Sequence, residues 1–129
     1  MHLNAEDQLA IQQLYARYNH AIDSGKADAW AETFTEDGVF ASSASGTTTG
    51  REALRAFATA FSSRLKARHW TNNLVLEATP DGAKGTCYLM LLRLSEGQPA
   101  SPIATGIYRD DLVKGAQGWR FAKRDVLSE

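Results

Sequence analysis

The sequence has little of several features that mark whole classes of protein. Its 129 residues include one cysteine, Cys87, so no disulfide bond can form within the chain. Lys and Arg, 14 in all, nearly balance 15 Asp and Glu, and the net charge of -1 offers nucleic-acid phosphates no general attraction. We therefore expect neither a disulfide scaffold nor a nucleic-acid-binding protein.

Long hydrophobic runs are also missing. The longest run, residues 88–92, falls far short of the roughly 20 apolar residues that cross a bilayer. Residues 1–7 carry acids, where a secretory signal would carry a basic segment followed by an apolar one. These patterns predict a cytoplasmic protein that does not enter a membrane.

Motifs for common cofactors are absent as well. The sequence has no glycine-rich dinucleotide motif, no Walker motif and no His-Glu-x-x-His metal pattern, so we expect no cofactor and no metal site. Cys87 lacks a Cys-x-x-Cys partner and lies in an apolar strand pattern, which predicts a small core residue.

The first half of the chain has helical patterns. Residues 7–22 place apolar side chains along one helical stripe that should end near Gly25. A short helix capped by Asp28 is expected to bury Trp30, Ala31 and Phe34. After a possible short strand at residues 37–44 and a mobile loop at residues 42–50, a capping-box pattern predicts a third helix that ends within residues 66–68.

The second half has strand patterns. Four runs rich in β-branched, aromatic and leucine residues cover approximately residues 68–79, 83–94, 102–113 and 118–127. The turns between them are too short for crossover helices, so successive strands should pair antiparallel. With 43% hydrophobic residues, the chain is expected to form one α+β domain over residues 1–129.

Residues 83–94 are apolar on both faces of the expected strand. One alternating set contains Cys87 and Leu89, and the other contains Tyr88 and Met90. Helices that cover one side of the sheet would leave the second set exposed. We therefore expect a homodimer that forms through the outer face of the sheet.

Several short patterns together resemble the SnoaL-like family of the nuclear transport factor 2-like superfamily. They are Asp7-x-x-Ala10-Ile11, Arg17-Tyr18-x-x-Ala21-x-Asp23-x-Gly25, Phe34-Thr35-x-Asp37-Gly38-x-Phe40, Gly50-Arg51-Glu52-Ala53-Leu54, His69-x-x-x-Asn73, Gly106-x-Tyr108-x-Asp110 and Trp119-Arg120-Phe121-x-x-Arg124. The resemblance spans nearly the whole chain. It implies a cone-shaped fold in which three helices and a curved, mainly antiparallel sheet enclose a pocket.

The superfamily's activities include polyketide cyclases, dehydratases and steroid isomerases, and it also includes assembly subunits of ring-hydroxylating dioxygenases. The dehydratases most similar to this chain use a tyrosine and an aspartate from the first helix and a histidine from the sheet. Tyr18, Asp23 and His69 match these residues in order and approximate spacing. Phe40 stands where some relatives have a tyrosine, and the later strands lack a second histidine, unlike the scytalone-type enzymes.

The helical geometry places Tyr18 and Asp23 on different sides of the first expected helix. Tyr18 lies within the apolar stripe, so it is either a hydrogen-bond donor to a ligand or a core residue with a paired hydroxyl. Asp23 lies about 140° further round the helix, which suits a pocket edge and an exposed helix end equally. A carboxylate near the end of a helix opposes the helix dipole, which favours a functional role.

Strand alternation leaves two interpretations for His69 and Arg124. His69 shares a face with Thr71, Asn73 and Val75, opposite the more apolar set of Trp70, Asn72, Leu74 and Leu76, so it faces solvent or a polar cavity. Histidine can accept and return a proton near neutral pH. Arg124 either balances an anionic intermediate or pairs with an acid such as Asp110 or Asp125.

These observations predict a cofactor-free acid/base enzyme that acts on a small hydrophobic carbonyl or hydroxyl compound. Catalysis is assigned to Asp23, His69 and Tyr18, and substrate binding to Tyr15, Trp30, Phe34, Phe40, Phe57, Phe61, Asn73 and Arg124. The reaction would be a dehydration, a cyclisation or an isomerisation. The alternative is a non-catalytic binding or assembly subunit.

Overall fold

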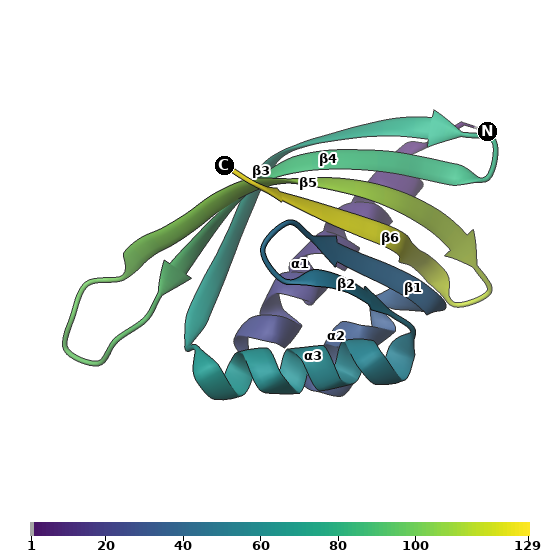
Figure 1. Ribbon diagram of the computed structural model, residues 1–129. Coiled ribbons are helices and arrows are strands. Elements are labelled where there is room, and N and C mark those ends of the chain that lie inside the picture. The colour runs from purple at the N-terminus through teal and green to yellow at the C-terminus, as the bar shows by residue number, and fades with distance from the viewer. Residues whose placement is uncertain (1) are drawn as a thin grey trace.

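The computed structural model describes residues 2–129, which form a helical layer on one side of a single curved sheet (Figure 1). The helices are α1 (Ala5–Asp23), α2 (Ala27–Glu32) and α3 (Arg51–Arg64). The sheet contains β1 (Phe34–Ser42), β2 (Gly46–Thr49), β3 (Ala67–Thr79), β4 (Gly82–Arg93), β5 (Ser101–Gly115) and β6 (Gly118–Ser128). This arrangement confirms the expected α+β fold.

The strands lie in the order β2-β1-β6-β5-β4-β3. Hairpins join β3 to β4, β4 to β5 and β5 to β6 in antiparallel pairs, as the short turns predicted. Only the β1 and β6 pair, among residues 2–129, is parallel. The long, bent strands wrap the sheet around the helices, so α1 and α3 lie inside its curve (Figure 1).

Helix α1 begins at Ala5, two residues before the expected stretch of residues 7–22. The Asn4 side chain accepts a hydrogen bond from the Asp7 backbone N–H at 2.8 Å, which caps the helix. The apolar stripe is buried against the sheet, and Gly25 follows the helix with a φ of 71°, a conformation that favours glycine.

Several element boundaries differ from the expectations. Phe34 was expected in the second helix, but α2 ends at Glu32 and Phe34 begins β1, where it pairs with Phe121 of β6. Residues 42–50 were expected to be a mobile loop, but Gly46–Thr49 pairs with β1 as strand β2. Strand pairing satisfies backbone groups even where the side chains have little to bury, which explains both differences.

The helix caps also differ. Lys26, rather than Asp28, is the N-cap residue of α2, and Gly50 occupies that position in α3 without a side-chain cap. Helix α3 ends at Arg64, earlier than the expected residues 66–68, because the following segment enters β3.

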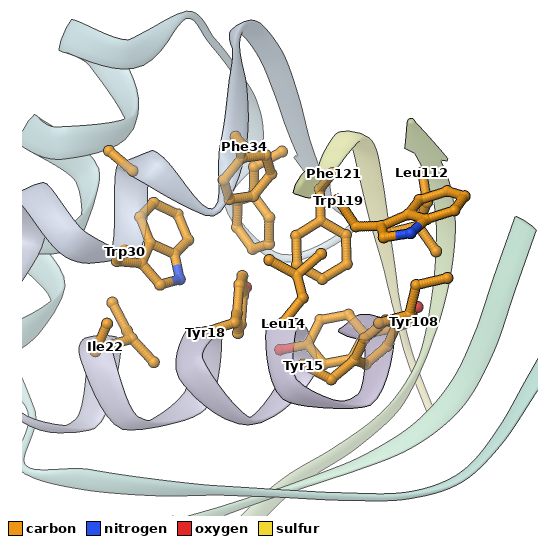
Figure 2. Close-up of a cluster of buried hydrophobic side chains, with 14 of the residues drawn as sticks. Leu14, Tyr15, Tyr18, Ile22, Trp30, Phe34, Tyr108, Leu112, Trp119 and Phe121 are labelled. Atoms are coloured by element: carbon orange, nitrogen blue, oxygen red, sulfur yellow. The ribbon is translucent and has the colours of Figure 1, made fainter. Parts of the chain in front are cut away.

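Aromatic side chains fill the space between the helices and the sheet (Figure 2). Tyr18 of α1 lies at the centre, with its ring centroid 5.5 Å from that of Trp30 and 5.6 Å from that of Phe121. Trp30 in turn stacks on Phe57 of α3 at 5.7 Å. Because these rings join all the main elements, they fix the position of α1 against the sheet.

A β-bulge in β3 changes which residues face inward. The pairing with β4 shifts between Asn72 and Val75, and Asn73 has a positive φ of 57°. Before the bulge, Trp70 is 59% exposed, so the expectation that Trp70 and Leu74 share the more buried face is wrong. Simple alternation fails here because one extra residue reverses the direction of those that follow.

Candidate functional site

The side chains of Asp23 and His69 lie in direct contact. Asp23 ends α1 and His69 is near the start of β3, and Asp23 Oδ1 lies 2.7 Å from His69 Nδ1. The backbone N–H of His69 also donates to both carboxylate oxygens at 3.1 Å. Each side chain is only 8% exposed, so water competes little with these contacts.

This geometry assigns a role to each ring nitrogen. Since a carboxylate only accepts hydrogen bonds, Nδ1 carries the hydrogen that is donated to Asp23. Nε2 is then the nitrogen that can take up a proton. Arg68 places its Nε 3.7 Å from the other carboxylate oxygen and provides a nearby positive charge.

A cavity of about 280 Å³ lies between the helices and the sheet, and His69 forms part of its wall. Its volume is just below the roughly 300 to 1,000 Å³ typical of ligand pockets. Most of the lining is apolar, and it includes Ile22, Trp30, Phe40, Phe57, Phe61, Leu89 and Leu91. The polar residues of the lining include Arg64, His69 and the phenols of Tyr18 and Tyr108. Such a cavity suits a small, mainly apolar ligand with one or two polar atoms.

A second, wider groove of about 730 Å³ lies on the other side of His69, between α1 and β3. Its wall includes Asp23, Arg68, Asn19 and Thr71, so it is more polar than the cavity. His69 lines both spaces. The Asp23 and His69 pair therefore separates an apolar cavity from a polar groove.

A buried ion pair supports the aromatic rings beside the cavity. Arg124 of β6 donates from Nε to Asp110 Oδ1 of β5 at 2.9 Å, and the Tyr15 hydroxyl donates to the other oxygen of Asp110. Arg124 is fully buried, with its guanidinium carbon 3.5 Å from the Tyr108 ring centroid and 4.3 Å from that of Tyr18. The cation thus packs against two of the phenol rings that line the cavity.

Burial controls the ionisation of this cluster. Desolvation raises the pKa of Asp110, whereas the charge of Arg124 and the hydrogen bond from Tyr15 oppose that rise. For Arg124, desolvation alone would lower the pKa, but the Asp110 carboxylate and the nearby tyrosines raise it overall, so the guanidinium stays charged. Burial also raises the pKa of the Cys87 thiol to about 11, so Cys87 is a neutral, buried side chain at neutral pH.

The structure brings together only part of the expected site. Tyr18, Trp30, Phe40, Phe57, Phe61 and His69 line the cavity, and Asp23 supports His69 from behind. Four expected substrate-binding residues lie elsewhere. Arg124 belongs to the ion-pair cluster, and so does Tyr15, which also lines the polar groove. Phe34 is in the aromatic core, and Asn73 is exposed at the β3 bulge.

Sequence reasoning missed Tyr108 as a cavity residue. The alternation of Tyr108, Asp110 and Leu112 along β5 was the available signal, because all three are buried on the inner face. No group of three or more His, Cys, Asp and Glu side chains within residues 2–129 is arranged to hold a metal ion. No helix in the described part of the chain is long and apolar enough to span a membrane.

Solved structures resemble this chain over nearly its whole length. A protein of unknown function from Mycobacterium tuberculosis is 32% identical, with a TM-score of 0.91, and the match covers 98% of this chain and 78% of that one. A protein from Catenulispora acidiphila, solved in complex with S-DNPA, is 30% identical with a TM-score of 0.87, and the match covers 97% and 95% of the two chains.

The Aln2 protein of a Streptomyces species is 26% identical with a TM-score of 0.89, over 97% of this chain and 92% of that one. No curated protein matches the chain significantly. Residues 4–125 match the family described as the SnoaL-like domain. The chain therefore belongs to the SnoaL-like family, whose nuclear transport factor 2-like fold is shared by polyketide cyclases and related enzymes.

Proposed function

We propose that this protein is a cofactor-free acid/base enzyme of the dehydratase, cyclase or isomerase type. The observation that carries the proposal is the contact between Asp23 and His69 at the wall of an apolar cavity. A histidine held by a carboxylate has a defined tautomer and orientation, which proton transfer to and from a bound molecule requires. The Catenulispora protein solved with S-DNPA supports a ligand-binding role for this fold.

In the proposed mechanism, His69 Nε2 removes a proton from the carbon beside a substrate carbonyl. The electron pair of that C–H bond moves toward the carbonyl oxygen, where the Tyr18 hydroxyl donates a hydrogen bond to the developing oxyanion. The imidazolium formed on His69 is stabilised by Asp23. For dehydration, the electron pair returns to form a C=C bond, and the proton on His69 leaves with the substrate hydroxyl as water.

Cyclisation and isomerisation begin with the same proton transfer. In a cyclisation the enolate carbon attacks a second carbonyl, whose π electron pair moves onto its oxygen, and that alkoxide takes the proton from His69. In an isomerisation the proton returns from His69 to a different carbon. The small, apolar cavity limits all three reactions to a substrate with few polar atoms. A cytoplasmic location remains a prediction from the sequence.

The experiment is a screen for ligands followed by a test of turnover. Native mass spectrometry and thermal-shift assays with aromatic hydroxyketones would identify a substrate. The variant His69→Gln keeps a side chain of similar length without an imidazole, and we expect it to lower kcat by about 10² to 10⁴. His2→Gln, at an exposed terminal residue, is the control and should keep full activity. Unchanged turnover in His69→Gln would reject the mechanism.

The second candidate is a homodimeric binding or assembly subunit. Its supporting observation is an apolar outer sheet face, where Trp70 is 59%, Tyr88 53% and Leu127 39% exposed. The strand register places Met90 beside Trp70, and Tyr88 beside Ile107, so these side chains form a continuous strip across four strands. A dimer through this face is compatible with either function, whereas an assembly subunit would bind ligands without converting them.

A further inference from the structure

The cavity between the helices and the sheet has a buried floor and an exposed rim. The floor includes Tyr18, Trp30 and Tyr108, which are at most 2% exposed. The rim consists of exposed residues from α3, from β5 and β6, and from the turn between β1 and β2, namely Ala44, Ser45, Arg64, Ala104, Thr105 and Ser128. A ligand in this cavity therefore has one end among aromatic rings and the other end near water.

Arg64, in the last turn of α3, supplies the guanidinium of this lining. Phe57, Phe61 and Arg64 are spaced by four and three residues, so they lie along one face of the helix. All three line the cavity. The Phe61 ring also lies beside His69, with the ring centroids 5.7 Å apart. The face of α3 that lines the cavity therefore carries Arg64 on the side where His69 lies.

No acid in the described part of the chain balances the charge of Arg64. Arg55, on the same helix, pairs with Asp28 and Glu52. Arg64 forms no ion pair within residues 2–129, and the cavity lining described there contains no Asp or Glu. The end of a helix favours a cation, but it offers only about half an elementary charge. The guanidinium therefore keeps donors that a ligand can use.

We propose that Arg64 binds a carboxylate of the ligand at the rim of the cavity. The substrate is then an apolar acid whose carbonyl or hydroxyl group points inward, to His69 and Tyr18. Arg64 acts as a specificity-determining residue, away from the reacting atoms. This inference rests on the proposed function for the inward group, whereas binding of the carboxylate itself needs no catalysis.

The position of Arg64 at the rim favours an acid over other ligands. A carboxylate there keeps part of its hydration, so it avoids the cost of burying a charge among the aromatic rings of the floor. The planar guanidinium can donate to both carboxylate oxygens at once. A neutral amide gains less from this contact, and an ammonium group would meet a like charge. The site should therefore prefer an acid to its amide and an amide to the corresponding amine.

The test compares an acid with its neutral amide, 2-naphthylacetate with 2-naphthylacetamide, by titration calorimetry. We expect the unaltered protein to bind the acid about 3- to 20-fold more tightly, as a partly exposed ion pair implies. Arg64→Gln should remove this preference by weakening the acid and leaving the amide nearly unchanged. Arg109→Gln is the matched control, because Arg109 is exposed on β5 between the buried residues Tyr108 and Asp110 and therefore faces away from the cavity.

Two further measurements do not depend on how Arg64→Gln folds. Raising the ionic strength from about 0.05 M to about 0.5 M should weaken binding of the acid to the unaltered protein and leave the amide unchanged, because salt screens an ion pair near the surface. The preference for the acid should also persist in His69→Gln, since the imidazole is not its source.

The outcomes separate this inference from the proposed function. Equal affinity for the acid and the amide, or a preference for the acid that remains in Arg64→Gln, would overturn the inference and leave the mechanism standing. For a substrate found by the ligand screen, Arg64→Gln should raise KM with little change in kcat, whereas His69→Gln should lower kcat. Binding of neither probe to the unaltered protein would overturn the ligand cavity, and the proposed function with it.

Discussion

Asp23 binds His69 at two points, through the Nδ1–H of the ring and through the backbone N–H of the same residue. The carboxylate therefore fixes both the position of the strand and the tautomer of the imidazole. Asp23→Asn should keep the backbone contact through its amide oxygen. Its NH₂ group would then face the His69 ring, and because NH₂ only donates, Nδ1–H would lose the acceptor that it requires.

We expect Asp23→Asn to fold and to lose about 10²-fold or more in kcat, because Nδ1 then no longer needs to carry the hydrogen. The ¹⁵N shifts of the His69 ring provide a readout that does not depend on a substrate. They should report hydrogen on Nδ1 in the unaltered protein and a mixture of tautomers in the variant. Asp28→Asn, at an exposed acid of α2, is the control. Unchanged ring shifts in Asp23→Asn would contradict this role.

The ion pair of Asp110 and Arg124 predicts a large effect on stability. Both side chains are at most 1% exposed, so Arg124→Met leaves a buried carboxylate without its cation and should cost about 3 to 5 kcal/mol. Replacing both partners, with Asp110→Leu and Arg124→Met, should restore much of the free energy of unfolding. Urea denaturation measures both. Lys84→Met breaks an exposed contact to Asp111 and should change stability by about 1 kcal/mol or less.

Asp7 predicts a pH dependence of stability at acidic pH. Hydrogen bonds from Lys114 and Trp119 lower the pKa of Asp7 below its usual value of 3.8. A lowered pKa in the folded state means that the carboxylate stabilises the fold above pH 3.8 and that this contribution disappears as the pH falls through the folded-state pKa. Asp7→Asn should therefore be less stable than the unaltered protein at pH 7. Denaturation curves for the two proteins should converge at low pH, and a constant gap would contradict the linkage.

The outer sheet face predicts self-association. The strip that includes Trp70 and Tyr88 is apolar and exposed, which favours a symmetric contact between two copies. Tyr88→Lys should shift the protein toward monomer, and analytical ultracentrifugation over a range of concentrations measures this. Leu9→Lys is a control on the solvent side of α1, where the side chain is 62% exposed. A monomeric mass for the unaltered protein at high concentration would reject the dimer.

Gly85 predicts a steric effect on the Tyr15 hydroxyl. A Cβ atom at this position would lie 2.2 Å from Tyr15 Oη, closer than any real contact allows. Gly85→Ala should therefore displace Tyr15 from Asp110 and lower the melting temperature. Adding Tyr15→Phe, which removes the hydroxyl, should reduce the cost of Gly85→Ala, and additive effects of the two substitutions would contradict the clash.

Much of the fold follows from local patterns in the sequence. The spacing of Ile11, Leu14, Tyr18 and Ile22 determines one buried stripe of α1, and short turns force the later strands to pair antiparallel. These features depend on residues that are close together in the sequence, so they can be predicted from it directly. The predictions for Phe34 and Trp70 were wrong because strand pairing and a β-bulge, rather than local spacing, decide where these two residues lie.

The candidate site depends on contacts between distant residues. Periodicity placed Asp23 on the flank of its helix and left His69 facing solvent or a cavity, and only the family resemblance suggested that they meet. The end of α1 lies against the start of β3 because the sheet bends around the helix, which joins residues 46 positions apart. The sequence by itself determined the elements and supplied the reactive groups, and the curvature of the sheet decided which of those groups lie together.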